Sequence, residues 1–389
     1  MTPSLLQRVR FRAALERAIR SYFDQRAFVE VFAPTLVPSP GLEPTLEALR
    51  VSARQAHEVD GHYLHTSPEF AIKTVLGELD ADVYCLARTY RDEPPSPLHS
   101  PEFTMLEWYR RADDYTPLMR DCEQLLTHVI AQLCPGHPLR IPLAGADART
   151  VLDLTAPFHR LRYRDAFLDL AGVDPLDPDT AAWEDALDRH GVSFERGWDR
   201  DTLESLVWCE VVEPSLPLDR GVLLTEFPRR HAALARALPA DPRFAERFEL
   251  YLPGLLPGRD QRHGTGHQPE NGAAPGGAQQ LAGGASGRGA WRGIELANAF
   301  AELTDADEQR RRFEADNRRR VDSGVSAYPL PEAMLEALSA MGPTAGIALG
   351  VDRLATVLAR LLHGWSVAPG DFLIAPSWTR SGPDREVGP

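Results

Sequence analysis

Aromatic and charged side chains alternate near residue 105 in a pattern that suits a binding pocket. Successive side chains of a β-strand point to opposite faces, so a strand over 101–110 would place Phe103, Glu107 and Tyr109 on one face. A ring, a carboxylate and a phenol on one face can stack a flat base and hold an amine. The alternative is a charged hairpin that faces solvent, and this segment alone does not decide between the two.

The segment before it carries charges of both signs beside a proline-broken turn. Segments 82–91 and 101–111 flank the turn at 93–100, which predicts an antiparallel hairpin with a long tip. Arg91 and Glu93 share a face by the same parity. An arginine there could hold a phosphate, and a carboxylate could accept a hydrogen bond from an exocyclic amine.

A glycine-bearing apolar strand over 345–350 runs directly into a helix, with Gly350 at the junction and Arg353 in the first helical turn. Helix starts attract anions, and glycine lets a ligand approach the backbone. The alternative is a packing turn in which Asp352 only caps the helix.

Three polar residues, Glu295, Asn298 and Glu302, interrupt an otherwise apolar strand. Unpaired carboxylates are costly to bury, and oxygen ligands of this kind suit magnesium. The alternative is a half-exposed strand whose polar groups face water. Glu295 and Glu302 are seven residues apart, so a regular strand puts them on opposite faces and only a bulge or the strand's end would bring both to one metal.

Together and in this order, these segments resemble the signature motifs of class II aminoacyl-tRNA synthetases, in the lysyl subgroup. The resemblance spans roughly residues 5–362. It implies an α+β fold, the class II catalytic fold with an antiparallel β-sheet flanked by helices, and a homodimer built on motif 1. The matching segments are 4–24 with 29–34, 66–73, 91–93 with 99–109, 293–309 and 346–353.

The resemblance also implies roles for individual residues. Catalytic roles fall to Arg91 at the α-phosphate and Arg353 at the γ-phosphate. The implied amino-acid site consists of Ser67, Pro68, Glu69, Glu107, Tyr109, Glu302 and Ala348. The implied ATP site consists of Arg91, Asp92, Glu93, His99, Ser100, Phe103, Glu295, Leu296, Gly350 and Arg353. Mg²⁺ would be bound by Glu295 and Glu302.

Within this family the chain resembles compact paralogues that attach (R)-β-lysine to a lysine of translation elongation factor P. The motif 1 helix begins almost at Met1, so we expect no anticodon-binding domain, and the net charge of −14 also argues against tRNA. Ala348 stands where lysyl enzymes usually have glycine. The implied function is ATP-dependent activation of (R)-β-lysine or lysine and its transfer to elongation factor P. The alternatives are a lysine-activating enzyme that charges tRNA or another acceptor, and an inactive regulatory module.

Three segments depart from the family pattern. The motif 2 tip, 94–98, has prolines where relatives usually carry an arginine, and Ser100 replaces the usual asparagine. Residues 227–231 read Phe-Pro-Arg-Arg-His in place of a more neutral stretch. The rim of the acyl pocket is therefore expected to differ.

The remaining sequence predicts one catalytic domain over 1–378, with a disordered Gly/Ala-rich insert at 254–293 and a disordered tail at 379–389. No apolar run approaches the ~20 residues that cross a bilayer, and four scattered cysteines favour reduced thiols. We therefore expect a cytoplasmic protein with no membrane partner. The predicted helices are 4–28, 115–133, 159–190 and one that Thr304 opens at about 305; the further predicted strands are 28–32, 221–227, 247–252 and 294–301.

Overall fold

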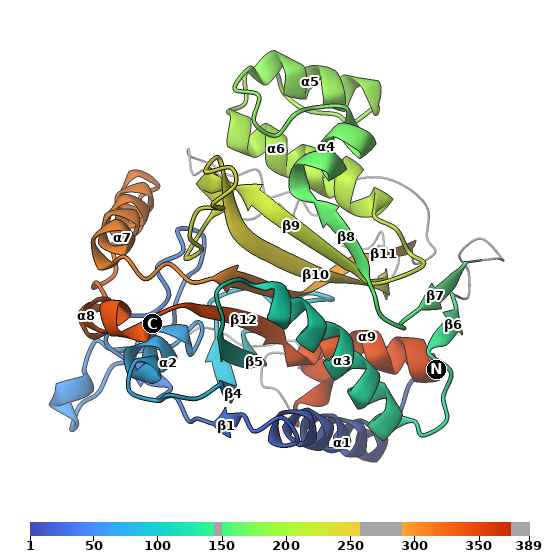
Figure 1. Ribbon diagram of the computed structural model, residues 1–389, viewed down its shortest axis with the longest axis horizontal. Helices are drawn as coiled ribbons and strands as arrows, with labels where there is room; N and C mark the ends of the chain where they lie inside the picture. Colours follow the sequence, from blue (N-terminus) through green and yellow to red (C-terminus); the bar gives the residue numbers. More distant parts are fainter. Residues whose placement is uncertain (144–149, 257–289, 375–389) are drawn as a thin grey trace, which may run out of the picture.

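A computed structural model of the protein describes residues 1–143, 150–256 and 290–374. Its centre is an eight-stranded sheet (Figure 1) in which the inner strands are antiparallel and the pairs β1–β4 and β8–β9 at the two edges are parallel. The strand order is β1 (Val29–Glu30), β4 (Val83–Tyr90), β5 (Glu102–Arg111), β12 (Thr344–Gly350), β11 (Ala290–Ala301), β10 (Phe244–Leu256), β9 (Val222–Pro228) and β8 (His159–Arg162). Two small hairpins are β2 (Leu36–Val37) with β3 (Tyr63–Leu64) and β6 (Arg140–Pro142) with β7 (Val151–Asp153).

One face of the sheet is covered by three helices: α1 (Leu5–Asp24), α3 (Thr116–Leu133) and α9 (Val351–His363). The start of α1 is fixed by a capping box between Ser4 and Gln7. Apolar residues at helical spacing, among them Leu15 and Ile19, then pack against alternate residues of the strands in one large core. This face of the sheet therefore forms the main hydrophobic core and is not open to a ligand.

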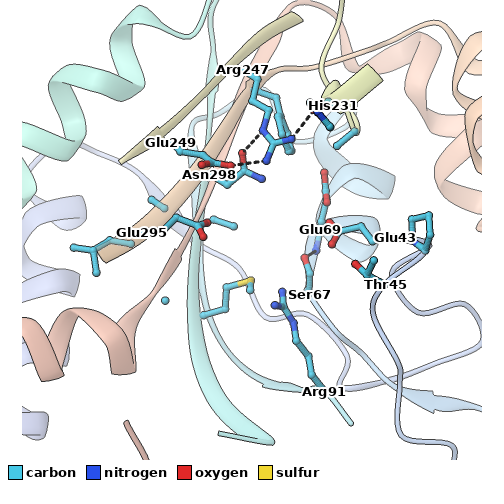
Figure 2. Close-up of a pocket in the computed structure, with 18 of the residues that line it drawn as sticks. Glu43, Thr45, Ser67, Glu69, Arg91, His231, Arg247, Glu249, Glu295 and Asn298 are labelled. Atoms are coloured by element: carbon cyan, nitrogen blue, oxygen red, sulfur yellow. Dashed lines mark hydrogen bonds and ion pairs between the residues drawn. The ribbon is translucent and has the colours of Figure 1, made fainter. Parts of the chain in front are cut away.

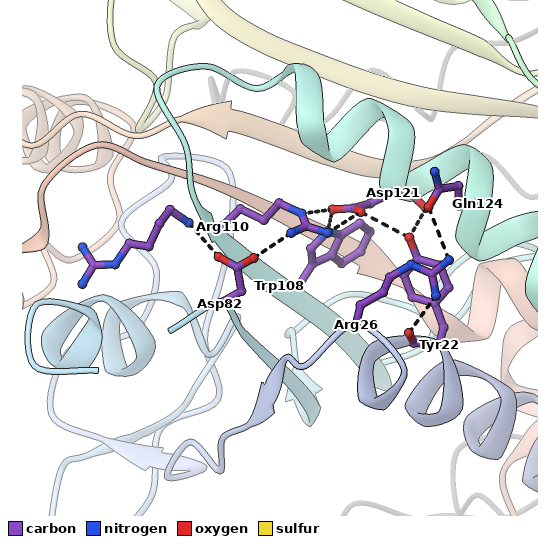
Figure 3. Close-up of polar contacts among 8 residues, drawn as sticks. Tyr22, Arg26, Asp82, Trp108, Arg110, Asp121 and Gln124 are labelled. Atoms are coloured by element: carbon purple, nitrogen blue, oxygen red, sulfur yellow. Dashed lines mark hydrogen bonds and ion pairs between the residues drawn. The ribbon is translucent and has the colours of Figure 1, made fainter. Parts of the chain in front are cut away.

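The polar contacts behind this face centre on the buried carboxylate of Asp121 in α3 (Figure 3). It accepts hydrogen bonds from Trp108 Nε1 at 3.2 Å, from Arg110 Nε at 2.6 Å and from the hydroxyl of Tyr22 at 3.2 Å. Because Trp108 and Arg110 lie on β5 and Tyr22 lies on α1, one carboxylate ties both helices to the central hairpin. This fixes the strand whose opposite face carries the predicted pocket residues.

In the part of the chain that the structure describes, the other face is covered at its two ends, by two separate groups of helices. The first group is α2 (Glu69–Leu76), α7 (Ala306–Asp322) and α8 (Glu332–Met341). The second group is α4 (Tyr163–Ala171), α5 (Thr180–Arg189), α6 (Arg200–Val207) and the π-helix η2 (Trp208–Val212). Single-turn 3₁₀ helices are η1 (His57–Val59), η3 (Glu213–Ser215), η4 (Arg229–His231) and η5 (Pro369–Phe372). The middle of this face lies between the two groups (Figure 1).

The predicted α+β class and the hairpin of β4 and β5 are confirmed. The prediction of helix over 159–190 is wrong at its start, because 159–162 pairs with β9 as strand β8. Helix α7 is capped by Asp305, which accepts from the backbone of Glu308, and not by Thr304. The ends of the predicted insert, 254–256 and 290–293, belong to β10 and β11; the rest of it, and the predicted tail, lie outside the described residues.

Candidate active site

The uncovered middle of the sheet is the floor of a cavity of about 660 Å³ (Figure 2). Alternate residues of β5 and β12, such as Met105 and Ala348, form part of the floor. Walls come from the loop that follows β2, from the start of α2, from η4 and from α7. The predicted parity of β5 is confirmed, because Leu106 and Trp108 pack in the core on the other face.

One end of the cavity is cationic. The guanidinium of Arg91 lies 5.3 Å from the centre of the Phe103 ring, and its enclosed Nε has no hydrogen-bond partner among the described residues. Arg353, in the first turn of α9, donates from Nη1 to the backbone oxygen of Glu295 at 3.0 Å. Two arginines beside an aromatic ring provide the contacts that a nucleoside polyphosphate needs.

His99 joins the loop between β4 and β5 to this end of the cavity. Its Nε2 lies 2.6 Å from Nη2 of Arg353, so the ring must accept this hydrogen bond. Burial, then the charges of Arg353 and Arg91, lower the pKa of His99 to about 4. The imidazole is therefore neutral at physiological pH and helps to orient Arg353 without adding charge.

The opposite end is acidic and closed. Glu107, 1% exposed, accepts from Ser67 Oγ at 2.5 Å and from the Tyr109 hydroxyl at 2.9 Å. Burial, then the nearby charge of Glu69, raises the pKa of Glu107 to about 8. A carboxyl held partly neutral in this way regains its charge when a cation arrives, which is the behaviour expected of an amine-binding site.

A buried lysine occupies part of this acidic end. Lys73 of α2 lies 2.6 Å from Glu69 Oε1 and 2.6 Å from Glu302 Oε2. The other oxygen of Glu302, Oε1, is enclosed and has no hydrogen-bond partner among the described residues. It is therefore an acceptor without a donor, which a substrate amine could satisfy.

The glycine at position 346 makes room for this arrangement. A Cβ there would lie 2.6 Å from Cδ1 of Tyr109 and closer still to Oε1 of Glu302. Both neighbours are held in place, Tyr109 by Glu107 and Glu302 by Lys73. Only glycine fits between them.

Most of the predicted site residues meet at this cavity. Its lining includes Ser67, Glu69, Arg91, Glu93, His99, Ser100, Phe103, Glu295, Leu296, Ala348, Gly350 and Arg353. The predicted residues outside the lining are Pro68, Asp92, Glu107, Tyr109 and Glu302. Of these, Glu107, Tyr109 and Glu302 form the buried acidic end next to it, whereas Pro68 precedes α2 and Asp92 is exposed.

Strand β11 does contain the bulge that a shared metal site required. Leu250 pairs with Ala297 and Tyr251 pairs with Glu295, so the residue between them, Leu296, has no partner on β10. The bulge brings Glu295 and Glu302 to the same face. Seven residues of strand still separate them by about 20 Å, and Glu302 is paired with Lys73. The expectation that these two carboxylates share one metal therefore does not fit the geometry.

Glu249 of β10 is the carboxylate that faces Glu295. Burial raises its pKa, Arg247 opposes that rise, and the charge of Glu295 adds to it. Arg247 Nη2 donates to Glu249 Oε1 at 2.6 Å, and Arg247 Nε donates to Asn298 Oδ1 at 3.0 Å (Figure 2). Both Glu249 and Glu295 line the cavity.

The sequence analysis missed several residues of this site. Glu249 lies between the buried residues Phe248 and Leu250, so the reasoning that selected Glu295 would have selected it as well. Lys73 has no such signal, because only Glu69 is a near neighbour in the sequence, four residues before it, and its other partner, Glu302, is 229 residues away. The residues missed are Glu43, Arg247 and Glu249, whereas Lys73, Arg230, His231 and Asn298 lay in segments that the sequence singled out but had no individual role.

The fold and the site together define a class II aminoacyl-tRNA synthetase catalytic domain. The sheet is antiparallel with parallel edges, a strand–helix junction carries Arg353, and Arg91 lies beside the ring of Phe103 on the neighbouring hairpin. The chain belongs to the family described as tRNA synthetases class II (D, K and N), which matches residues 1–257 and 290–367.

Curated relatives agree with this assignment over most of the chain. It is 34% identical to the elongation factor P–(R)-β-lysine ligase of Erwinia tasmaniensis over 349 residues, which cover 88% of each chain. It is 33% identical to the ligase of the same name from Pectobacterium atrosepticum, again with 88% of each chain covered. With the Vibrio vulnificus ligase the identity is 31%, over 95% of this chain and 97% of the relative.

Proposed function

We propose that the protein uses ATP to activate (R)-β-lysine, or lysine, as an aminoacyl-adenylate and transfers the acyl group to a lysine side chain of elongation factor P. The observation that carries this proposal is a single cavity with two arginines at one end and a buried, partly neutral carboxyl cluster at the other. The names of the relatives support the amino acid and the acceptor.

In the activation step the substrate carboxylate attacks the α-phosphorus of ATP, the new C–O–P linkage forms, and the bond to pyrophosphate breaks. No protein nucleophile is required, so the protein contributes position and charge. Arg91 would hold the α-phosphate, and Arg353 would hold the γ-phosphate, oriented by His99. Phe103 would stack on adenine, whose amino group would donate to Glu93; both line the same end.

The acidic end would select the substrate by its amines. Oε1 of Glu302 lacks a donor, and Glu107 is held partly neutral. An ammonium group would satisfy the first carboxylate and return the second to its charged form. Ala348, between Glu107 and Asn298 in the sheet, adds a methyl group to the cavity floor. This methyl would favour the shifted amine of a β-amino acid over an α-amino group.

The proposed reaction uses Mg²⁺, and the carboxylates that fit it are Glu249 and Glu295. They lie on the neighbouring strands β10 and β11 and both line the cavity, and a bound cation would relieve their mutual repulsion. Among the described residues no three His, Cys, Asp or Glu side chains gather closely enough to form a complete metal cage. This agrees with Mg²⁺, which is usually held by one or two carboxylates together with substrate phosphates. Bound there, the ion would neutralise phosphate charge.

A homodimer, a cytoplasmic location and independence from tRNA belong to the same proposal. Leu5, Leu6 and Phe32, in and after α1, are 51%, 57% and 84% exposed, which suits an interface between two copies. Within the described residues, Cys85, Cys122 and Cys134 carry free thiols, as in a reducing compartment. The described residues contain no helix with the length and hydrophobicity to span a bilayer.

Pyrophosphate exchange tests the proposal. We expect ATP–pyrophosphate exchange that depends on (R)-β-lysine and is weaker with α-lysine, without any tRNA present. If neither amino acid supports exchange, the alternative of an inactive regulatory module would replace this proposal. Exchange with a different class of amino acid would contradict the role given to the acidic end.

A further inference from the structure

The rim of the cavity at η4 carries basic residues that the activation step does not use. Residues 229–231 follow β9, and Arg230 and His231 line the cavity. The segment is bracketed by two residues with left-handed backbone, Glu226 at φ 57° and Ala233 at φ 48°. Non-glycine residues rarely adopt this conformation, and such strain concentrates at functional sites. The backbone therefore holds this segment in one definite position.

A buried carboxylate from the second helix group lies behind the rim. Glu204 of α6, 3% exposed in its side chain, has Oε2 paired with Arg230 and Oε1 bonded by the Tyr163 hydroxyl at 2.9 Å. Nε2 of His231 lies 3.2 Å from Oε1 of Glu204, and this enclosed nitrogen has no aligned hydrogen bond among the described residues. Burial alone would raise the pKa of Glu204, but His231 and Arg230 lower it to about 2. Glu204 is therefore a fixed negative charge beside the imidazole.

The backbone of His231 is fixed from the cavity side as well. Its carbonyl oxygen accepts from Nη1 of Arg247 at 2.5 Å, and Arg247 also holds Asn298 and Glu249 (Figure 2). The ring stands at the cavity with one nitrogen against a buried carboxylate and a third of the side chain exposed. This is the arrangement of a general base and its orienting group.

We infer that His231, positioned by Glu204, accepts the proton of the acceptor lysine during transfer of the acyl group. The inference rests on the proposed function and adds a catalytic residue to its second step. The transfer step requires a proton acceptor, because a lysine side chain has an ordinary pKa of about 10.4 and its ammonium form is not a nucleophile. The groups that face His231 are Tyr163, Glu204, Arg230 and Arg247.

The proton balance of the step is simple. The ammonium of the acceptor gives one proton to His231, and Glu204 stabilises the imidazolium that forms. The neutral amine then attacks the acyl carbon, the C–N bond forms, and the acyl C–O bond breaks with its electron pair on AMP. The second proton of the amine passes to the phosphate of AMP, and His231 releases its proton to water.

The same part of the cavity offers an approach for a cationic side chain. Glu43 and Asp316 line it; burial raises the pKa of Asp316 to about 6, Arg319 opposes that rise, and the charge of Glu43 adds to it. Arg312 of α7, whose Nη1 donates to the carbonyl oxygen of Ala233 at 3.0 Å, joins Asp316's helix to the rim. The two carboxylates partly offset the charges of Arg312 and Arg319, which line the same cavity, and so lower the electrostatic cost of bringing an ammonium group to His231.

The test separates activation from transfer with His231→Gln, which keeps a polar side chain but cannot accept a proton at neutral pH. We expect pyrophosphate exchange within about twofold of wild type, and transfer to the acceptor protein slower by about a hundredfold or more in single turnover. Hydroxylamine is mostly unprotonated at neutral pH, so its capture of the adenylate should be unaffected. Added imidazole should partly restore transfer in His231→Ala.

The matched control is Arg243→Gln, which also removes a positive charge but changes a side chain that pairs with Asp241 outside the cavity lining; we expect normal transfer. Glu204→Gln should slow transfer and leave exchange unchanged. The inference is overturned if His231→Gln transfers at the wild-type rate, if it loses hydroxylamine capture and protein transfer equally, or if Arg243→Gln is as slow. A wild-type protein that catalyses no exchange would instead overturn the proposed function itself.

Discussion

Gly346→Ala is the change that most sharply probes the acidic end of the cavity. The added Cβ would lie 2.6 Å from Cδ1 of Tyr109 and nearer still to Oε1 of Glu302. Neither neighbour can move freely, because Glu302 is bonded to Lys73 and Tyr109 is bonded to Glu107. Overpacking of this kind costs about 1–3 kcal/mol of folding free energy. Displacement of Glu302 also removes a hydrogen bond to a charged group, about 1.5–3 kcal/mol of substrate binding.

These magnitudes translate into a measurable pattern. Gly346→Ala should lower Tm by a few degrees and raise the KM for lysine or β-lysine in pyrophosphate exchange by about ten- to a hundredfold, with the KM for ATP within about twofold. The matched control is Gly350→Ala in the same strand, where a Cβ meets only the side chain of Arg353 at 3.8 Å. It should retain Tm and the amino-acid KM. Unchanged amino-acid KM in Gly346→Ala would refute the placement of the amine site beside Glu302.

Three more outcomes are expected. Arg353→Ala should slow pyrophosphate exchange about ten- to a hundredfold while the circular dichroism spectrum stays that of wild type, since it removes a charged contact to phosphate; exchange within about threefold would contradict that role. Ala348→Gly should raise kcat/KM for α-lysine relative to β-lysine by about tenfold or more, and an unmoved ratio would make Ala348 a packing residue only. Burial raises the pKa of Glu107 from 4.5 to about 8, so the folded protein favours the protonated carboxyl. The free energy of folding gained from this protonated form is complete below pH 4.5 and is lost as pH rises toward 8. Tm measured from about pH 5 to about pH 9 should therefore fall less in Glu107→Gln than in wild type, and equal slopes would exclude this carboxyl as a source of the pH dependence.

The parts of the fold that the sequence predicts are those set by local periodicity. The alternation along β5 correctly separates Met105 and Glu107 from Leu106 and Trp108, because strand parity depends only on neighbouring residues. The segment 159–162 was expected to begin a helix. It forms β8 because it pairs in parallel with β9, some 60 residues later. No local pattern contains that information.

The site residues likewise fall into those that local motifs predict and those that contacts between distant segments determine. Residues that belong to a motif, such as Arg91 and Arg353, are brought to one cavity as predicted. The partner of Glu302 is Lys73, which is 229 residues away in the chain. The bulge at Leu296 is likewise set by pairing with β10. Contacts between distant segments therefore decided which carboxylates are free to bind a ligand.

The central claim is that one cavity activates β-lysine and delivers it to a protein. The most direct measurement is the intact mass of elongation factor P after incubation with the purified protein, ATP and (R)-β-lysine. We expect a mass increase equal to one β-lysyl group, on a lysine side chain, that requires ATP and forms about ten- to a hundredfold more slowly with Arg353→Ala. An unchanged mass under conditions where pyrophosphate exchange proceeds would contradict the proposed acceptor.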